Sequence, residues 1–147
     1  MHDRILLLSQ LATTLPLAGL IWVVQWVHYP LFQRVGDNEF CHFHAEHTRR
    51  ITWIVMPLMM VELATSLAML QSTPAWCTNA QAWIGLGLVG LAWLGTACLS
   101  VPAHNTLAKG KHASTISTLV WTNWIRTIAW TARSAGLLSL LAMRYSP

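Results

Sequence analysis

The chain has 147 residues, of which 54% are hydrophobic and 10% are charged, and its formal net charge is +4. Ordinary soluble domains carry about 25% charged residues, and a soluble helix bundle needs a polar outer face on every helix. The composition therefore excludes an ordinary soluble domain and favours an integral membrane protein. No basic cluster of the kind that binds nucleic acid accompanies the positive charge.

The first predicted span covers residues 5–32 and contains no Asp, Glu, Lys or Arg. Its apolar run continues through Val24 without a small-residue cleavage site, which indicates a retained helix rather than a signal peptide. Gln25, His28 and Tyr29 follow helical spacing near the end of this span. Polar groups in lipid need partners, so we expect this face to turn toward other helices.

The second predicted span covers residues 51–70, and its helix is expected to start near residue 38 because Asp37 and Asn38 are turn formers and helix caps. On that helix His44, His47 and Glu62 fall on one stripe. Four of the seven histidines lie within residues 25–47, so several imidazoles are predicted to gather at one end of the molecule.

The third and fourth predicted spans cover residues 80–101 and 116–141. Small residues form one face of the third, and one further turn along that face reaches His104. Asn123, Arg126, Trp130 and Arg133 share a face of the fourth. A guanidinium inside a membrane needs a partner, and Glu62 is the only carboxylate within the four spans. The sequence therefore predicts an ion pair between Glu62 and Arg126, with Arg133 as a looser neighbour.

Loop charges predict the orientation. The two connections at the histidine-rich end carry five basic residues, and the opposite end carries two: Arg34, Arg49, Arg50, Lys109 and Lys111 against Arg4 and Arg144. Because cytoplasmic loops are enriched in Lys and Arg, both termini are expected outside. Cys41, Cys77 and Cys98 are separated by this topology, so they are predicted to be unpaired thiols.

The histidines suggest chemistry. Neutral imidazoles bind zinc, copper or iron, so the sequence predicts a transition-metal site, with His42 as a spare ligand. The predicted ligands are His28, His44, His47 and His104. Two alternatives stay open: histidines that are only hydrogen-bonded near headgroups, and a haem held by His28 and His104. The haem is less favoured because these residues lie near the end of the bundle rather than deep inside it.

Four segments carry a resemblance: VQWVHYPLFQRVG (24–36), HAEHTRRITWIVMPLMMVEL (44–63), VPAHNTLAKG (101–110) and TNWIRTIAWTARS (122–134). The chain resembles a group of small bacterial four-helix integral membrane proteins that has no assigned activity. More distantly, it is similar to the anthrone-oxygenase-like four-helix membrane proteins. That second resemblance implies oxidation of an aromatic or quinone-like substrate, and it maps onto Pro102, His104, Asn123 and Arg126.

We therefore predict an all-α, antiparallel four-helix bundle of one domain, residues 1–147, in the bacterial inner membrane. The predicted function is that of a metal-dependent, oxidoreductase- or oxygenase-like enzyme acting on a hydrophobic aromatic or quinoid molecule. The alternative is a non-enzymatic accessory or ligand-binding bundle; self-association is left open. His28, His104 and Arg126 are the predicted catalytic residues, and the predicted substrate-binding residues are Gln25, Tyr29, Glu62, Asn123 and Trp130.

Overall fold

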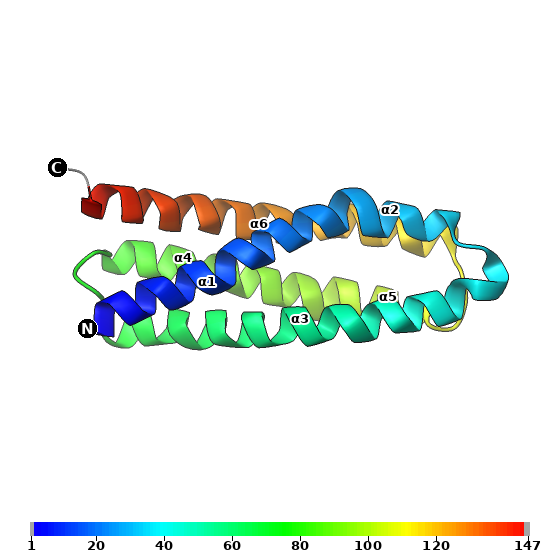
Figure 1. The fold of residues 1–147 in the computed structure, drawn as a ribbon, viewed down its shortest axis with the longest axis horizontal. Coiled ribbons are helices and arrows are strands. Elements are labelled where there is room, and N and C mark those ends of the chain that lie inside the picture. The colour runs from blue at the N-terminus through cyan, green and yellow to red at the C-terminus, as the bar shows by residue number, and fades with distance from the viewer. Residues whose placement is uncertain (1, 146–147) are drawn as a thin grey trace.

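A computed structural model describes residues 2–145, and this part of the chain is all-helical, without a β-strand. It forms four long helical stretches (Figure 1). Their elements are α1 (His2–Val23), η1 (Val24–His28), α2 (Tyr29–Leu31) and η2 (Phe32–Arg34); α3 (Asp37–Gln71); α4 (Asn79–Leu94), η3 (Gly95–Ser100) and α5 (Val101–Leu107); and α6 (Ala113–Tyr145).

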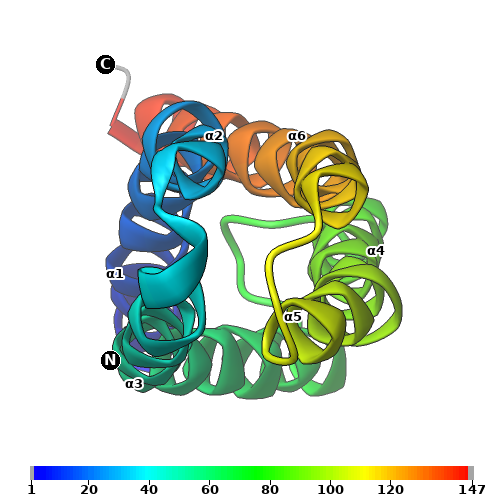
Figure 2. The same cartoon turned by 90° about the vertical axis from the view of Figure 1, so that its right-hand side faces the viewer.

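The stretches lie side by side. In Figure 1 the start of α1, the 72–78 connection and the end of α6 share one end of the molecule, which we call the terminal end. The 35–36 and 108–112 connections share the other, which we call the histidine end. Viewed along the axis, the helices occupy the corners of a square (Figure 2): α1 contacts α3 and α6, and α4 contacts the same two. Apolar side chains such as Phe32, Phe40, Met59 and Trp130 fill the interior.

Two π-helical turns, η1 and η3, interrupt the first and third stretches just before Pro30 and Pro102. The backbone N–H of Tyr29 bonds Val24 O in η1, and that of Val101 bonds Thr96 O in η3, each across five residues. Proline has no N–H and clashes with the preceding turn, so a widened turn accommodates it. A π turn holds more residues than an α-helical turn, so it shifts the face on which the following residues lie. Beyond the two turns, Tyr29 is 3% exposed and its hydroxyl lies 3.1 Å from His104 Nε2.

The second helix is longer than its apolar part. α3 runs from Asp37 to Gln71 without a break at Pro57, which confirms the predicted start near residue 38. Gly36 precedes the helix as its cap, so the capping residue lies one position before the predicted Asp37. The continuous helix carries His44, close to its start, and Glu62, some five turns further on, in one rigid element.

Three of the four stretches in the described chain are long and apolar enough to cross a membrane: 3–34, 37–71 and 79–107. The sequence predicted four spans, and α6 is not among the three; it carries Asn123, Arg126 and Arg133 together with several Thr and Ser residues. Large aromatic side chains nonetheless point outward, including Trp53 at 77% exposed and Trp121, on α6, at 74%. Exposed tryptophans suit a lipid-facing surface better than a water-facing one.

Candidate functional site

Arg126 is the centre of a buried polar network between α6 and the ends of the first and third stretches. Its Nε donates to Asn123 Oδ1 at 3.1 Å, Nη2 donates to Tyr29 Oη at 3.1 Å, and Nη1 donates to Thr96 Oγ1 at 3.4 Å. All three acceptors are neutral. Arg126 is only 7% exposed, and none of the ion pairs found among residues 2–145 includes it. The structure therefore holds a buried cation without a carboxylate partner.

Gln25 fixes the orientation of Asn123. Gln25 Oε1 accepts from Asn123 Nδ2 at 2.8 Å, and Gln25 Nε2 donates to Val120 O at 3.1 Å. With its amide nitrogen bonded to Gln25, Asn123 presents Oδ1 to Arg126. Gln25 and Asn123 are 3% and 0% exposed, so this part of the network supports the site from behind rather than facing a cavity. These two predicted substrate-binding residues position Arg126.

A chain of hydrogen bonds leads from Arg126 to α3. Tyr29 Oη lies 3.1 Å from His104 Nε2, and His104 Nδ1 lies 2.9 Å from His44 Nε2. Tyr29 Oη already accepts from Arg126, which leaves its single proton free to point at His104 Nε2. In that arrangement His104 donates from Nδ1 to His44 Nε2. Three helical stretches are thus joined by one continuous chain of hydrogen bonds.

The path ends on atoms without partners. His44 is 1% exposed and stacks on Phe40, yet its Nδ1 has no hydrogen-bond partner among the described residues. His47 Nε2 is buried and unpartnered in the same way. Buried polar atoms are nearly always satisfied in folded proteins. Of the four buried side-chain atoms without a partner in the described chain, two are imidazole nitrogens at this end of the molecule.

Beside this network lies a cavity of about 260 Å³, which we call the Arg126 cavity. Tyr29, His104 and Arg126 supply the ionisable groups of its wall. Most of the remaining wall is apolar and comes from the first stretch and α3, with the ring of Trp130 on α6: Leu17, Leu20, Ile21, Val24, Ile51, Val55 and Met56. An apolar cavity with a few convergent polar groups is the usual form of a small-molecule site.

The predicted ion pair between Glu62 and Arg126 is wrong. Glu62 instead pairs with Arg133: Arg133 Nε lies 3.1 Å from Glu62 Oε1, and both side chains are almost fully buried. Glu62 Oε1 also accepts from Thr14 at 2.6 Å, and Oε2 accepts from Trp130 Nε1 at 3.0 Å. The prediction counted depth from assumed span starts, and the actual register between α3 and α6 differs by two helical turns. Glu62 is not among the residues that line the Arg126 cavity, but its partner Trp130 is.

The four histidines predicted to bind metal do come near one another. Ring centroids lie 5.3 Å apart for His28 and His47, 5.1 Å for His44 and His104, and 6.4 Å for His47 and His104, whereas His42 is exposed. Within the described chain, however, no group of three or more His, Cys, Asp or Glu side chains is arranged to hold a metal ion. The nitrogens by which His44 and His104 face each other, Nε2 and Nδ1, are joined by a hydrogen bond. Metal binding stays a prediction from the sequence.

Sequence reasoning missed some of the partners. Thr96 was expected only as part of a small-residue packing face, although its hydroxyl accepts from Arg126. Gln10 and Ser66 were not singled out, yet both accept hydrogen bonds from Arg133 Nη2. The only signal was that polar residues in apolar spans need partners.

In comparisons with known proteins, no family model, no curated protein and no solved structure matches the chain.

Proposed function

We propose that the protein spans a membrane four times as an antiparallel bundle, with the histidine end in the cytoplasm. Support comes from the three apolar stretches, from the outward tryptophans, and from Arg34, Lys109 and Lys111 at the histidine end. α6 completes the bundle as the fourth span because its two arginines face inward and find polar partners there. The site then opens between helices at membrane depth, where a hydrophobic molecule is concentrated.

Within that frame we propose an enzyme, oxidoreductase-like in class, that removes a proton from a hydrophobic aromatic or quinoid molecule in the Arg126 cavity. The observation that carries this proposal is the buried guanidinium of Arg126, which has only neutral partners and lies in an apolar wall. An oxyanion on the substrate supplies the missing negative charge. A preorganised cation in a dry site stabilises such an anion far more than water does.

Tyr29, His104 and His44 provide the route for the proton. The substrate gives its proton to Tyr29 Oη while Tyr29 passes its own to His104 Nε2. His104 then releases its Nδ1 proton to His44 Nε2, since these atoms are already at hydrogen-bond distance. One proton leaves the substrate and one arrives on His44, near the histidine end. Arg126 stays protonated throughout and holds the anion.

The resemblance to anthrone-oxygenase-like proteins supports oxidation as the step that follows. An enolate or phenolate loses electrons more readily than its neutral parent. With dioxygen as the oxidant, a ring CH₂ group becomes a carbonyl and one water is released, which balances atoms and electrons. The chain's own part is to bind the substrate, hold the anion and remove the proton.

A coloured phenol tests the first half of this scheme. We expect purified protein in lipid nanodiscs to bind 4-nitro-1-naphthol and to lower the pH at which the bound phenol ionises, seen as phenolate absorbance. Arg126→Gln should abolish that shift because the cation is gone. Arg49→Gln is the matched control, since it removes an exposed positive charge that pairs with Glu46.

Two outcomes count against the enzyme. Binding without any change in ionisation favours the non-enzymatic ligand-binding alternative. An equal shift in wild type and Arg126→Gln means that the phenolate is not held in the Arg126 cavity, and the proposal fails.

A further inference from the structure

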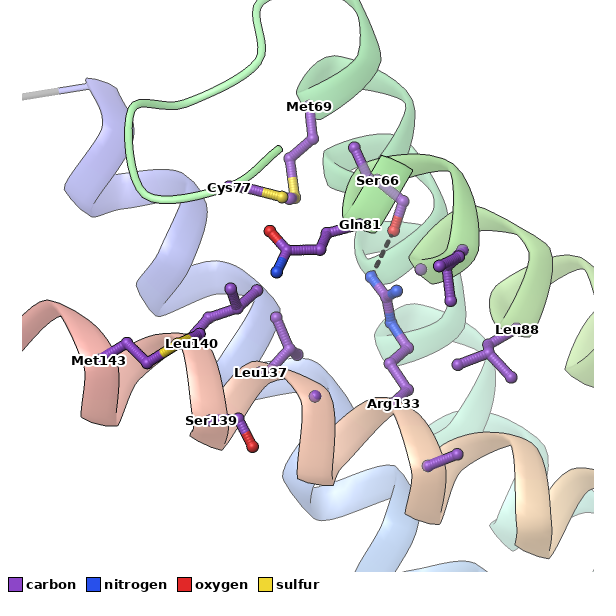
Figure 3. Close-up of a pocket in the computed structure, with 15 residues that line it drawn as sticks. Ser66, Met69, Cys77, Gln81, Leu88, Arg133, Leu137, Ser139, Leu140 and Met143 are labelled. Atoms are coloured by element: carbon purple, nitrogen blue, oxygen red, sulfur yellow. Dashed lines mark hydrogen bonds between the residues drawn. The ribbon is translucent and has the colours of Figure 1, made fainter. Parts of the chain in front are cut away.

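A second cavity, of about 210 Å³, lies toward the terminal end among α3, α4 and α6, and we call it the Arg133 cavity (Figure 3). Most of its wall is apolar or small: Met69, Ala82, Ile84, Gly85, Leu88, Ala132, Gly136, Leu137, Leu140 and Met143. Ser66, Cys77, Gln81, Ser139 and Arg133 supply its polar atoms. The proposed chemistry at Arg126 uses none of these residues.

Arg133 keeps one edge of its guanidinium free for this cavity. Nε is bonded to Glu62, and Nη2 is bonded to Gln10 and Ser66. Among the described residues no hydrogen bond from Nη1 is found, and Nη1 faces Gly85, where an added Cβ would lie 2.6 Å from it. A side chain at that position would require the end of Arg133 to shift. The absent side chain keeps a charged donor open to the cavity.

Gln81 offers a second donor. Its Oε1 accepts from the backbone N–H of Thr78 at 2.8 Å, as one half of the capping box that starts α4. That bond holds the carboxamide in place, and Figure 3 shows it in the space between Met69 and Leu137. The Nε2 of Gln81 takes part in no hydrogen bond found in the described chain. The cavity therefore presents two N–H donors against an apolar wall.

The charge around Arg133 selects a neutral ligand. Glu62 already neutralises this guanidinium at 3.1 Å, and both partners are almost completely buried. A second carboxylate or phosphate would leave one uncompensated negative charge in a low-dielectric interior, which is costly. A neutral acceptor loses nothing of this kind and still accepts from Nη1. Arg126 differs because it has no carboxylate partner, so an anionic ligand there would neutralise its charge.

We propose that the Arg133 cavity binds an uncharged hydrophobic molecule through a carbonyl oxygen, which accepts hydrogen bonds from Arg133 Nη1 and Gln81 Nε2. Two sources have this chemistry: the ester carbonyl of a membrane lipid, and a free aromatic ketone or quinone. The site is separate from the Arg126 cavity, with the pair of Glu62 and Arg133 between them. It does not depend on the proposed enzymatic function.

Benzophenone is a suitable probe because it is an uncharged aromatic ketone that links covalently to nearby C–H groups on illumination, methionine among the best. In nanodiscs made with an ether-linked lipid, we expect it to label Met69 or Met143, which line the Arg133 cavity. The carboxylate analogue 4-benzoylbenzoate should not label them. If the Arg126 cavity accepts anions, the analogue should label Met56 instead.

Two glycines of α4 give a matched pair of variants. Gly85→Ala places a methyl group against Nη1 and should reduce labelling of Met69 and Met143 by about tenfold, as expected for loss of one charge-assisted hydrogen bond. Gly87→Ala makes the same change of residue where nothing lies within 4 Å, and labelling should be unchanged. If Gly85→Ala fails to fold, Gly136→Ala takes its place: an added methyl group there meets nothing within 4 Å, but Gly136 lines the cavity, so labelling should fall.

The source of the carbonyl is read from the lipid. Labelling that drops when an ester-linked lipid replaces the ether-linked one identifies the lipid ester as the occupant, and equal labelling in both identifies a free ketone. The proposal is overturned if benzophenone labels neither methionine, if 4-benzoylbenzoate labels them equally, or if Gly85→Ala and Gly87→Ala behave alike. If 4-benzoylbenzoate does not label Met56, that result counts only against the enzymatic proposal.

Discussion

Two arginines lie on one face of α6, seven residues or about 10 Å apart, and their surroundings differ in kind. Arg133 pairs with a carboxylate whose two oxygens also bind Thr14 and Trp130. Arg126 has neutral partners only, and the chain that leads away from it ends on an unpartnered nitrogen of His44. The two arginines lie on the same helix and are buried to a similar degree, yet the charge of Arg133 is neutralised within the fold and that of Arg126 is not.

The difference separates holding the fold from binding a ligand. The neutralised network at Glu62 ties α1, α3 and α6 together at the terminal half of the molecule. The network at Arg126 contains only neutral partners, and in the proposed function this leaves Arg126 able to bind an anion. A protein that needed Arg126 only for packing would be expected to place a carboxylate near it, as it does for Arg133.

The largest expected effect is the loss of Glu62. Glu62→Ala strands the buried cation of Arg133, and breaking a buried pair in this way costs about 3–5 kcal/mol. The free energy of unfolding, measured by denaturant titration in detergent micelles, should fall by that amount. Arg133→Ala should cost a similar amount because it strands the carboxylate.

A double-mutant cycle then locates the partner. Glu62→Leu combined with Arg133→Leu should recover much of the stability that either single change loses, because no buried charge remains. Glu62→Leu combined with Arg126→Leu should give additive losses. If stability were instead recovered in the variant that combines Glu62→Leu with Arg126→Leu, and the losses were additive in the other, Arg126 rather than Arg133 would be the partner of Glu62.

Arg126 should contribute less to stability than Glu62 or Arg133, and more to ligand binding. Arg126→Met removes a buried cation that has no counter-charge, and it leaves Tyr29 Oη and Asn123 Oδ1 without a donor. We expect a loss of about 1–3 kcal/mol from these unsatisfied groups. Thermal unfolding of Arg126→Met beside Glu62→Ala checks the order; a larger loss at Arg126 would make it a structural residue.

The sequence predicted the helices well because their signals are local. Runs of uncharged apolar residues mark the first three stretches, and Asp37 and Asn38 mark the start of α3 within one residue. The inward face of Gln25 and Tyr29 follows from spacing, and so does the shared face of Asn123 and Arg126. These predictions need no knowledge of how helices are placed against one another.

Register between helices could not be predicted. Choosing Arg126 over Arg133 for Glu62 required the relative height of α3 and α6, and both arginines lie on the same face. The π turns before Pro30 and Pro102 also change direction locally, and a proline alone does not reveal a widened turn. For the same reason the contact between His44 and His104 was expected only as a gathering of imidazoles.

His44 should contribute little to stability. His44→Phe keeps an aromatic ring stacked near Phe40, removes one neutral hydrogen bond to His104 and removes the unpartnered Nδ1. The loss and the gain nearly cancel, so we expect a change of about 1 kcal/mol or less in the free energy of unfolding. Proton release should slow nonetheless. Stopped-flow detection of phenolate formation in His44→Phe and wild type tests this, and an unchanged rate would remove His44 from the path.

The smallest expected effect concerns two cysteines that leave the fold untouched. Cys41 is exposed on α3 at the histidine end, whereas Cys77 is buried in the 72–78 connection, with its thiol 3.3 Å from Thr78 O. Burial raises the pKa of the Cys77 thiol, and the positive charge of Arg133 only partly opposes this. A raised pKa means less thiolate at neutral pH, and thiolate is the form that reacts.

With Cys98 replaced by Ser, variants that keep either Cys41 or Cys77 should therefore differ in how they are labelled in intact cells. An impermeant maleimide should label Cys41 only after the membrane is opened. It should label Cys77 from outside but slowly, with a rate that keeps rising as the pH is raised. Fast labelling of Cys41 in intact cells would reverse the proposed orientation and place the histidine end outside.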